Sequence, residues 1–469
     1  MLFSHARCAT CSISAVPVSD PIVALSTPPG RSGIGVIRLS GTHALELMRK
    51  LLRKDHFSPR ANRVSLQTIF DPESGETLDR ALITYFQAPH SFTGEDVIEF
   101  SCHGSPVLLL RVIDALLLLG ARTADPGEFT LRALAHGRIN LNQAEAIRDL
   151  IDAQTHAAVR QAARQLGGEL SARLQPIKNA LLDIIVPLES SLEFVEDDLP
   201  EITLERISER LSNLIQRLGD LASTFRAGRL LKEGLRIALV GRPNVGKSSV
   251  FNRLLASDRA IVTDIPGTTR DSLSELINIQ DILILLTDTA GVRTSDNLIE
   301  AIGIERTRRA MADADLIILV LDGTQTLTSE DKELLADVRE NKYLIALNKS
   351  DLEDFALSNA GGLNGAPIMP ISAKTGAGFD AFRDAILKPF TATDIQDGCF
   401  LITNARHYDL LRRASDALYS AKQLLESRTS EDLILLRLYE SLRILGEITG
   451  ETTPEDVLSQ IFATFCIGK

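Results

Sequence analysis

Apolar residues follow two different periods along this 469-residue chain, and the change of period divides it into regions. Between residues 20 and 137, short apolar runs alternate with turns, which is typical of strands. The clearest predicted strands are 35–40, 81–86 and 96–101. A longer apolar run, 107–121, is interrupted by Arg111 and Asp114 and is shorter than the ~20 residues of a membrane span. It predicts a buried amphipathic helix, so we expect this region to be an α+β domain.

From about residue 138 onward, apolar positions recur every three or four residues, which is the period of a helix with one buried face. This pattern fills 138–233 and returns in 389–469, on either side of the 234–388 segment. Neither helical stretch carries enough apolar positions for a bundle of its own. We therefore predict one discontinuous all-α domain with an inserted domain, because insertions are tolerated where chain ends lie close together at the surface. No transmembrane segment is predicted.

The inserted segment contains a phosphate-binding pattern, Gly241–Ser248, which reads GRPNVGKS. It lies between an apolar strand, 235–240, and a predicted helix start at 249–255. In such a loop the backbone N–H groups surround the phosphates, Lys247 lies against the outer two, and the Ser248 hydroxyl can ligate Mg²⁺. ATPases share this pattern, so alone it leaves the nucleotide open. The residues expected to contact the nucleotide are Asn244, Val245, Gly246, Lys247, Ser248 and Ser249.

Three further motifs follow in the order that a guanine-nucleotide domain requires, each after an apolar strand. They read DTAG at Asp288–Gly291, NKSD at Asn348–Asp351 and SAK at Ser372–Lys374. The Asp351 carboxylate can accept hydrogen bonds from N1–H and the exocyclic amine of guanine, whereas adenine offers no matching pair. The four motifs together predict a Ras-like P-loop GTPase domain. Its further nucleotide contacts are expected from Asp288, Thr289, Ala290, Gly291, Asn348, Lys349, Ser350, Asp351, Ser372, Ala373 and Lys374.

Between the first two motifs lies a polar segment, Thr263–Asp271, which reads TDIPGTTRD. Its glycine, proline and hydroxyl groups are typical of a mobile switch loop. Thr269 is the candidate for a second hydroxyl on Mg²⁺, and Arg270 is interpreted as a solvated arginine. Contacts to GTP are also expected from Thr263, Asp264, Ile265, Pro266, Gly267, Thr268 and Thr269.

The residue after DTAG is Val292, where Ras-like GTPases have the glutamine that orients the attacking water. A valine cannot orient water, so hydrolysis must use another water-positioning group, a cation or a side chain from a partner. Asp296 and Glu300 are the acidic candidates in the stretch that follows, and their spacing does not choose between them.

The formal net charge of −12 argues against broad nonspecific binding to nucleic acid, which depends on neutralising phosphates. An RNA partner would need a local basic patch or a helper protein. Five cysteines in a chain of this size provide no disulfide framework, which favours a reducing compartment such as the cytoplasm. Residues 1–19 contain no acid and one arginine. We interpret them as a disordered extension or a mis-assigned start, with a cleavable targeting segment as the alternative.

The two ends of the chain carry features that the nucleotide motifs do not explain. Gly33 and Gly35 are not followed by a helix, so they do not form a dinucleotide-binding turn. The last residues, FATFCIGK, are largely apolar, which predicts that this end packs against another part of the protein. Cys466 is either a nucleophilic thiol or a small buried side chain, and the lack of a recognisable base beside it favours the buried role.

Five blocks of the sequence resemble the family of bacterial tRNA-modification GTPases known as MnmE or TrmE. They read TPPGRSGIGVIRLSG, SFTGEDVIEFSCHG, PGEFTLRALAHGRINLNQAEA, the four motifs with TDIPGTTRD, and GEITGETTPEDVLSQIFATFCIGK at the end. The resemblance covers roughly residues 20–469. It implies a homodimer that works with a flavoprotein partner of the MnmG type, in a heterotetramer or larger assembly, with FAD on the partner only. Together they would add an aminomethyl or carboxymethylaminomethyl group to carbon 5 of the wobble uridine of certain tRNAs.

The resemblance also implies roles for individual residues. The N-terminal domain, residues 20–137, would dimerise and bind a tetrahydrofolate of the 5,10-methylene or 5-formyl type, which supplies the one-carbon unit. Its contacts would be Arg38, Glu99, Arg138 and Lys469. K⁺ would bring the two G domains together and stabilise the transition state from a site formed by Asn244, Thr263, Ile265 and Thr268. The catalytic residues would be Glu300, which orients the water, Lys247 and Thr269.

Two other functions stay open at this point. One is a GTPase assembly factor, for example of ribosomes, that does no modification chemistry. The other is a folate-dependent enzyme with a regulatory G domain and no obligate partner. Assembly factors typically append an RNA-binding module. The sequence contains no Gly-x-x-Gly helix-turn of the KH type, and its five Tyr and no Trp offer few rings for stacking on RNA.

Overall fold

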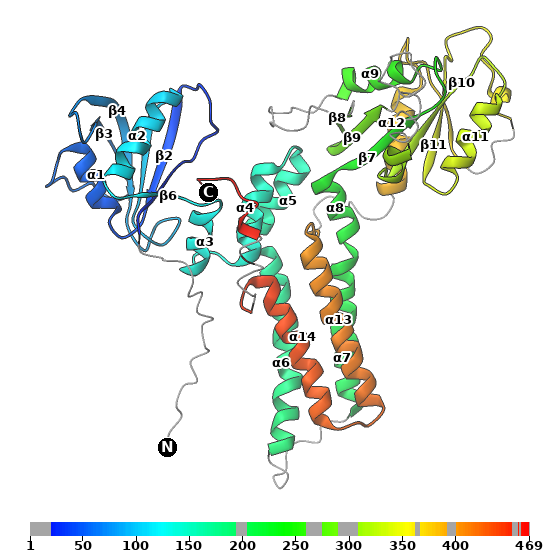
Figure 1. Cartoon of the computed structure of the whole chain (residues 1–469). Coiled ribbons are helices and arrows are strands. Elements are labelled where there is room, and N and C mark those ends of the chain that lie inside the picture. The colour runs from blue at the N-terminus through cyan, green and yellow to red at the C-terminus, as the bar shows by residue number, and fades with distance from the viewer. Residues whose placement is uncertain are drawn as a thin grey trace. The chain divides into compact units, whose positions relative to one another are not determined.

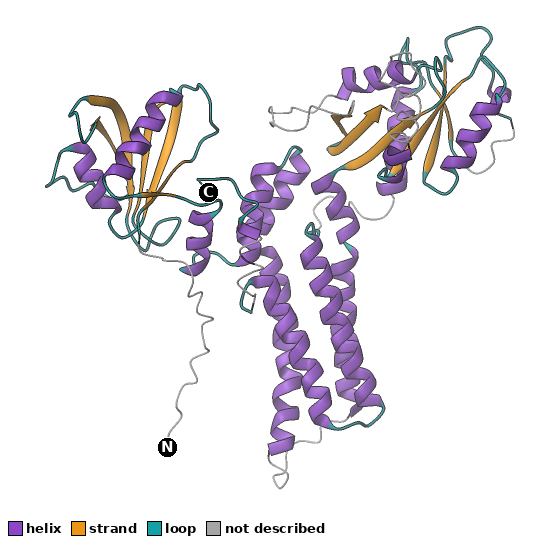
Figure 2. Cartoon of the chain, in the orientation of Figure 1, coloured by secondary structure: helices purple, strands orange, loops and turns teal. Residues whose placement is uncertain are grey.

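The computed structural model describes residues 20–193, 204–258, 274–288, 308–361, 366–391, 400–452, 458 and 461–468. The chain divides into two compact units. The first comprises Met1–Arg148, Gln165–Ile202 and Ser420–Lys469, and the second comprises Asp149–Arg164 and Thr203–Tyr419. Each unit contains a six-stranded sheet (Figure 1, Figure 2). The predicted combination of an α+β region, helices and a P-loop domain is confirmed, whereas the predicted domain boundaries stay a prediction.

The sheet of the first unit has the order β3-β4-β5-β2-β1-β6. Its strands are β1 (Ile22–Leu25), β2 (Ile34–Ser40), β3 (Val64–Phe70), β4 (Thr77–Phe86), β5 (Val97–His103) and β6 (Arg122–Thr123). Neighbouring strands are antiparallel except for the short parallel pair of β1 and β6. The three strands predicted most clearly from the sequence correspond to β2, β4 and β5.

Helices cover the two faces of this sheet unequally. Helices α1 (Ala44–Leu52) and α2 (Pro106–Leu118) pack on one face, against a core that includes Ile37 and Phe100. Helix α3 (Glu128–Ala135) covers only the β1 side of the other face, where Phe129 packs on Ile22. The predicted amphipathic helix is therefore confirmed as α2, with one buried face.

Long helices of the first unit come from distant parts of the sequence. Helix α4 (Leu141–Asp152) begins in this unit, and helix α6 (Glu169–Glu193) packs against helix α14 (Glu431–Thr449). The buried Lys178 of α6 donates a hydrogen bond to Thr449 and pairs with Glu451, so the contact includes a charged link.

The C-terminal end packs onto the first unit, as its apolar residues predict. Phe462 and Phe465 are buried against Leu141 of α4 in a small apolar cluster. The expectation that Cys466 is buried is wrong, because its thiol is exposed. The two phenylalanines occupy the inward positions of this last turn, and Cys466 follows them on the outer side.

The second unit carries a mainly parallel sheet with the order β12-β11-β10-β7-β9-β8. Its strands are β7 (Leu235–Val240), β8 (Ser274–Ile279), β9 (Ile282–Asp288), β10 (Leu316–Asp322), β11 (Tyr343–Asn348) and β12 (Ile368–Pro370). Helices α9 (Lys247–Asp258) and α12 (Phe379–Thr391) pack on one face, and α11 (Ser329–Val338) packs on the other. Because both faces are covered, the central strands are apolar throughout rather than alternating.

The second unit also contains α7 (Leu204–Ser223), α8 (Phe225–Glu233) and a short 3₁₀ turn, η1 (Leu357–Ala360). Helices α5 (His156–Leu166) and α13 (Ala405–Glu426) begin in this unit and end in the first. Helix α8 leads into β7, and the chain that returns from the sheet packs on it. The rings of Phe225 and Tyr408 stack with centroids 4.6 Å apart, and the Ile402 N–H donates to the Thr224 hydroxyl at 3.0 Å. In the part of the chain that the structure describes, no helix has the length and apolar character of a membrane span.

Candidate functional site

The phosphate-binding loop follows β7 directly, and its backbone leaves no room for larger side chains. A Cβ at Gly241 would lie 2.4 Å from the Val320 carbonyl oxygen, and one at Gly246 would lie 2.3 Å from Asn348 Nδ2. Gly246 also has a φ of +98°, a conformation that glycine adopts without strain. The loop therefore needs glycine at both positions, and it delivers Lys247 to the first turn of α9.

The buried Lys247 side chain folds back over this loop. Its Nζ donates to the carbonyls of Gly241 and Arg242 at 2.6 and 2.9 Å. Burial lowers the pKa of Lys247, and the nearby Asp288 carboxylate opposes that shift. Phosphate oxygens can replace the two carbonyls as acceptors, which is the role that the sequence predicts for this lysine.

The side chains of Ser248 and Asp288 meet at the end of the loop. The Ser248 hydroxyl donates to the Asp288 carboxylate at 3.3 Å. A hydroxyl and a carboxylate are the oxygen ligands that Mg²⁺ prefers, and a single ion can contact both directly or through its waters. The residues present therefore fit the predicted magnesium site.

Asn348, at the end of β11, joins the phosphate-binding loop to the segment Ser372–Lys374. Its Nδ2 donates to the Val245 carbonyl at 2.9 Å, and its Oδ1 accepts from the Ala373 N–H at 3.0 Å. The residue is 3 % exposed. The motif residue that sequence reasoning assigned to nucleotide contact thus also holds two separate loops together.

The predicted base selector, Asp351, is held by a residue of the segment Ser372–Lys374. The Ser372 hydroxyl donates to its Oδ1 at 2.6 Å. This hydrogen bond holds the pKa of Asp351 below its ordinary value, so the carboxylate is ionised at neutral pH and acts only as an acceptor. An ionised acceptor suits the two N–H donors of guanine.

Lys349 has a second, structural contact. Its φ is +72°, and its Nζ donates to Asp322 at the end of β10 at 2.6 Å. Burial alone would raise the pKa of Asp322, but the hydrogen bonds from Lys349 and Thr324 hold it below its ordinary value. The ion pair therefore fixes the backbone that leads from Asn348 to Asp351.

Sequence reasoning missed Arg253, which lies on α9 outside every motif. Its Nε donates to the Ala373 carbonyl at 3.0 Å, and its other nitrogen donates to the Lys374 carbonyl. The only signal in the sequence is a basic residue six positions after Lys247. Asp322 was missed as well, although it ends a fully buried strand.

Several predicted site residues lie outside the described residues. They are Thr263, Asp264, Ile265, Pro266, Gly267, Thr268 and Thr269 of the switch loop, Thr289, Ala290 and Gly291 of the DTAG motif, Glu300 and Lys469. Ser249 and Ser350 are described, and both flank the loops discussed above. Asn244 is exposed in the phosphate-binding loop with a φ of +67°.

A second group of predicted residues meets on the sheet of the first unit. Arg38 and Glu99 are partners in the register of β2 and β5. The Arg38 guanidinium donates to one Glu99 oxygen at 3.0 and 2.8 Å. It also reaches the Gly468 carbonyl at 3.4 Å, which in turn accepts from the Ser26 hydroxyl. The chain end thus lies beside the Arg38–Glu99 pair, one residue before Lys469.

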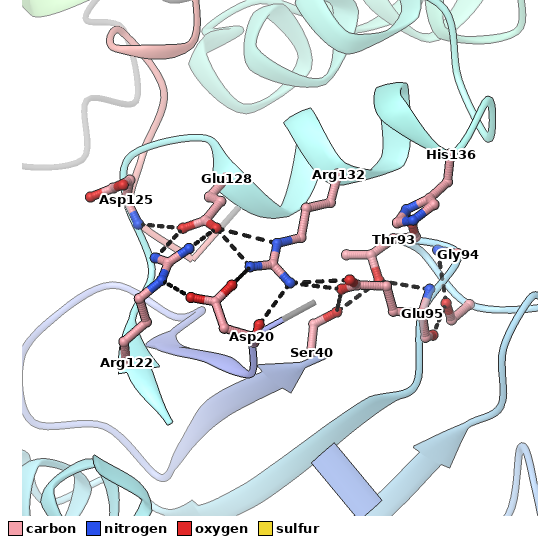
Figure 3. A network of polar contacts seen from close by, with 11 residues as sticks. Asp20, Ser40, Thr93, Gly94, Glu95, Arg122, Asp125, Glu128, Arg132 and His136 are labelled. Atoms are coloured by element: carbon pink, nitrogen blue, oxygen red, sulfur yellow. Dashed lines mark hydrogen bonds and ion pairs between the residues drawn. The ribbon is translucent and has the colours of Figure 1, made fainter. Parts of the chain in front are cut away.

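Arg138 occupies a different position in the same unit. It is exposed after α3, and a Cβ at Gly94 would lie 3.4 Å from its Cγ. Gly94, which is labelled in Figure 3, lies in the loop that precedes β5. Arg138 therefore lies near the segment that precedes Glu99, without a described contact to Glu99 itself.

Arg253→Ala removes both donors to the loop that carries the base-recognition segment. We expect the dissociation constant for GTP to rise about tenfold, since a charged donor to a carbonyl contributes about 1.5–3 kcal/mol. Titration of the variant with GTP measures this. Arg383→Ala is the matched control, because Arg383 pairs with Asp258 of α9 at 2.8 Å and has no contact with that loop. Equal affinity of the wild type and Arg253→Ala would contradict the role of Arg253.

Comparison with known proteins agrees with this geometry. The family model described as the MnmE helical domain matches residues 141–466, and the one described as the GTP-binding protein TrmE N-terminus matches residues 21–138. The tRNA modification GTPase MnmE of Koribacter versatilis is 44 % identical over 455 residues, which are 96 % of this chain and 100 % of that protein. The protein of the same name from Aquifex aeolicus is 41 % identical over 452 residues, again 96 % and 100 %. The chain therefore belongs to the MnmE family of tRNA modification GTPases.

Proposed function

We propose that this chain binds and hydrolyses GTP, and that it uses this cycle in the modification of tRNA. The observation that carries the proposal is the Asn348 side chain, which fixes a phosphate-binding loop against a guanine-recognition loop. The tRNA part of the proposal comes from two relatives, both named as tRNA modification GTPases. They are identical to this chain at 44 % and 41 % of the aligned positions.

Residues of the described G domain account for nucleotide binding. Lys247 and the loop N–H groups hold the phosphates, Ser248 holds Mg²⁺ with Asp288 beside it, and Asp351 recognises guanine. Thr269 would supply the second hydroxyl to the metal. Hydrolysis without a Ras-type glutamine would use Glu300 to orient the water.

A bound K⁺ ion would supply positive charge to the transition state. Its proposed ligands are Asn244, Thr263, Ile265 and Thr268. The exposure of Asn244 is compatible with this role, because a cation at the phosphate-binding loop can reach it. Two G domains would meet across this site, so hydrolysis would depend on dimer formation.

The Arg38–Glu99 pair would bind the tetrahydrofolate derivative together with Arg138 and Lys469. A carboxylate accepts the amine and ring N–H donors of a pterin, and cations pair with the carboxylates of its glutamate tail. The side chains of Arg38 and Glu99 are 15 % and 26 % exposed, so they are accessible but fixed by each other.

The proposed homodimer has support on the same sheet. Val64, Leu66 and Leu82 are 62 %, 53 % and 44 % exposed on the face that carries α3, in its β3–β4 part, which α3 leaves uncovered. An apolar sheet face of this kind is typical of a contact with a second subunit. The modification itself would need an MnmG-like flavoprotein that carries FAD, and we place the reaction on the wobble uridine of certain tRNAs in the cytoplasm.

Asp351→Asn replaces one acceptor oxygen by an N–H₂ donor, which would face the N–H donors of guanine. We expect GTP affinity to fall about tenfold or more, and affinity for xanthosine triphosphate to rise, because xanthine carries a carbonyl where guanine has its amine. Competitive titration with both nucleotides measures the ratio. Asp354→Asn, an exposed acid nearby, serves as the control. Unchanged GTP affinity in the Asp351 variant would refute the assignment.

Hydrolysis is expected to be about tenfold faster in KCl than in NaCl at the same ionic strength, since the proposed cation stabilises developing charge in a site selective for its size. Single-turnover rates in the two salts test this, and GTP affinity measured in parallel separates binding from chemistry. Equal rates in the two salts would contradict a role for K⁺ in hydrolysis.

Glu99→Gln removes the charge that pairs with Arg38 and with pterin donors. We expect the affinity for 5-formyltetrahydrofolate to fall about tenfold or more, because charge-assisted hydrogen bonds are lost, while GTP hydrolysis stays at the wild-type rate. Calorimetric titration of the full chain measures binding. The control is Glu73→Gln, an exposed acid of the same domain. Wild-type affinity in Glu99→Gln would exclude this pair from the folate site.

A further inference from the structure

Arg132 of α3 is a fully buried arginine with four acceptor groups around it (Figure 3). Its guanidinium donates to Glu128 at 2.9 Å and to both oxygens of Glu95 at 3.1 Å. It also donates to the backbone carbonyl of Asp20 at 2.9 Å and to its carboxylate at 3.1 Å. Every arm of the planar side chain is therefore engaged, in a geometry that a lysine cannot reproduce.

Stability alone does not explain a buried charge cluster. Arg132 and Arg122 face three carboxylates, Asp20, Glu95 and Glu128, and removing such groups from water costs free energy that their attraction only partly returns. Well-packed apolar side chains of similar volume often stabilise a core as well or better. The directional hydrogen bonds of the cluster do what apolar packing cannot, because they fix the relative positions of the segments that they join.

The segments joined by Arg132 carry the two aromatic rings beside Arg38. Glu95 ends the loop that contains Phe92, and Glu128 precedes Phe129 on α3. The Arg38 guanidinium carbon lies 5.5 Å from the centroid of the Phe92 ring and 5.7 Å from that of Phe129. The Ser40 hydroxyl donates to Glu95 at 2.8 Å, which ties the Phe92 loop to the strand of Arg38 itself.

The start of α3 also touches the C-terminal end of the chain. Gly127, the residue before Glu128, donates its N–H to the Cys466 carbonyl at 3.4 Å. Its φ is +70°, and a Cβ there would lie 3.0 Å from the Phe462 carbonyl oxygen and from Cβ of Phe465. The position of α3 therefore determines where the chain end lies, and that end reaches Arg38 through Gly468.

We propose that Arg132 is a positioning residue of the Arg38–Glu99 site: by joining Asp20, Glu95 and Glu128, it sets the aromatic rings and the chain end around the Arg38 guanidinium. The proposal rests on the proposed binding of a folate at this site. Arg132 is fully buried, so it acts on the ligand only through the residues that it positions.

The test is calorimetric titration of the full chain with 5-formyltetrahydrofolate in the wild type and in Arg132→Lys. A lysine keeps the charge but cannot serve Glu95, Glu128 and Asp20 at once. We expect the dissociation constant to rise about tenfold to a hundredfold, as when supporting contacts of a site are loosened. GTP hydrolysis, measured on the same samples, is expected to stay at the wild-type rate.

A second measurement reports position without the ligand. Amide hydrogen exchange in residues 91–95 and 461–468 is expected to accelerate together in Arg132→Lys, because both segments lose their common support. Val112→Ala is the matched control, since Val112 lies in the core of the same sheet on its α2 face. It lowers the unfolding temperature without touching the cluster. If Arg132→Lys does not fold, Glu95→Gln, which keeps the shape and loses the charge, takes its place.

The outcomes separate this inference from the proposed function. If the wild type binds no folate, the folate site fails, and the exchange data alone decide whether Arg132 positions the two segments. If the wild type binds folate and Arg132→Lys binds it equally well, the inference is wrong. It is also wrong if Val112→Ala loses as much affinity for the same drop in unfolding temperature, because the effect would then be one of stability only.

Discussion

The hydrogen bonds of Asn348 are the constraint on which the nucleotide site depends. The loops that we propose to bind the phosphates and the base lie 103 and 25 residues from Asn348 in the sequence, and its buried carboxamide holds both. Its donor and its acceptor are each used once, so neither an aspartate nor a leucine can replace it. Because Lys349 and Asp322 fix the following backbone, the strand end that joins the two loops also fixes the position of Asp351, the proposed base selector.

The first unit solves a similar problem in a different way. Arg38, Glu99 and the chain end come from a strand pair and from a segment 430 residues away, so local structure cannot align them. There the fixed support is a charged cluster around Arg132 rather than one amide (Figure 3). Both sites thus use buried polar groups for position, at a cost in desolvation that apolar packing would avoid.

Sequence patterns predicted those parts of the structure that depend on neighbours along the chain. The apolar runs before each motif correspond to β7, β9, β11 and β12, because strand period and burial are local signals. Arg253 was not predicted, since its partners lie about 120 residues away in the sequence. Arg132 was not predicted either: Glu128 lies four residues before it, but Glu95 and Asp20 lie 37 and 112 residues away, and nothing in a local window marks an arginine as buried. Cys466 was predicted to be buried but is exposed, because an apolar tail does not reveal which of its residues face inward. The folate-binding role of Glu99 came only from resemblance to a family and stays a prediction.

The central claim is that a GTP-dependent site in this chain serves the chemistry of a tRNA base. Its most direct test is mass-spectrometric analysis of wobble-uridine nucleosides in tRNA from cells that lack the chain, before and after the wild type or Asn348→Ala is restored. We expect the C5-modified uridine to disappear in these cells, to return with the wild type and to stay absent with Asn348→Ala. An unchanged nucleoside profile in cells without the chain would contradict the central claim.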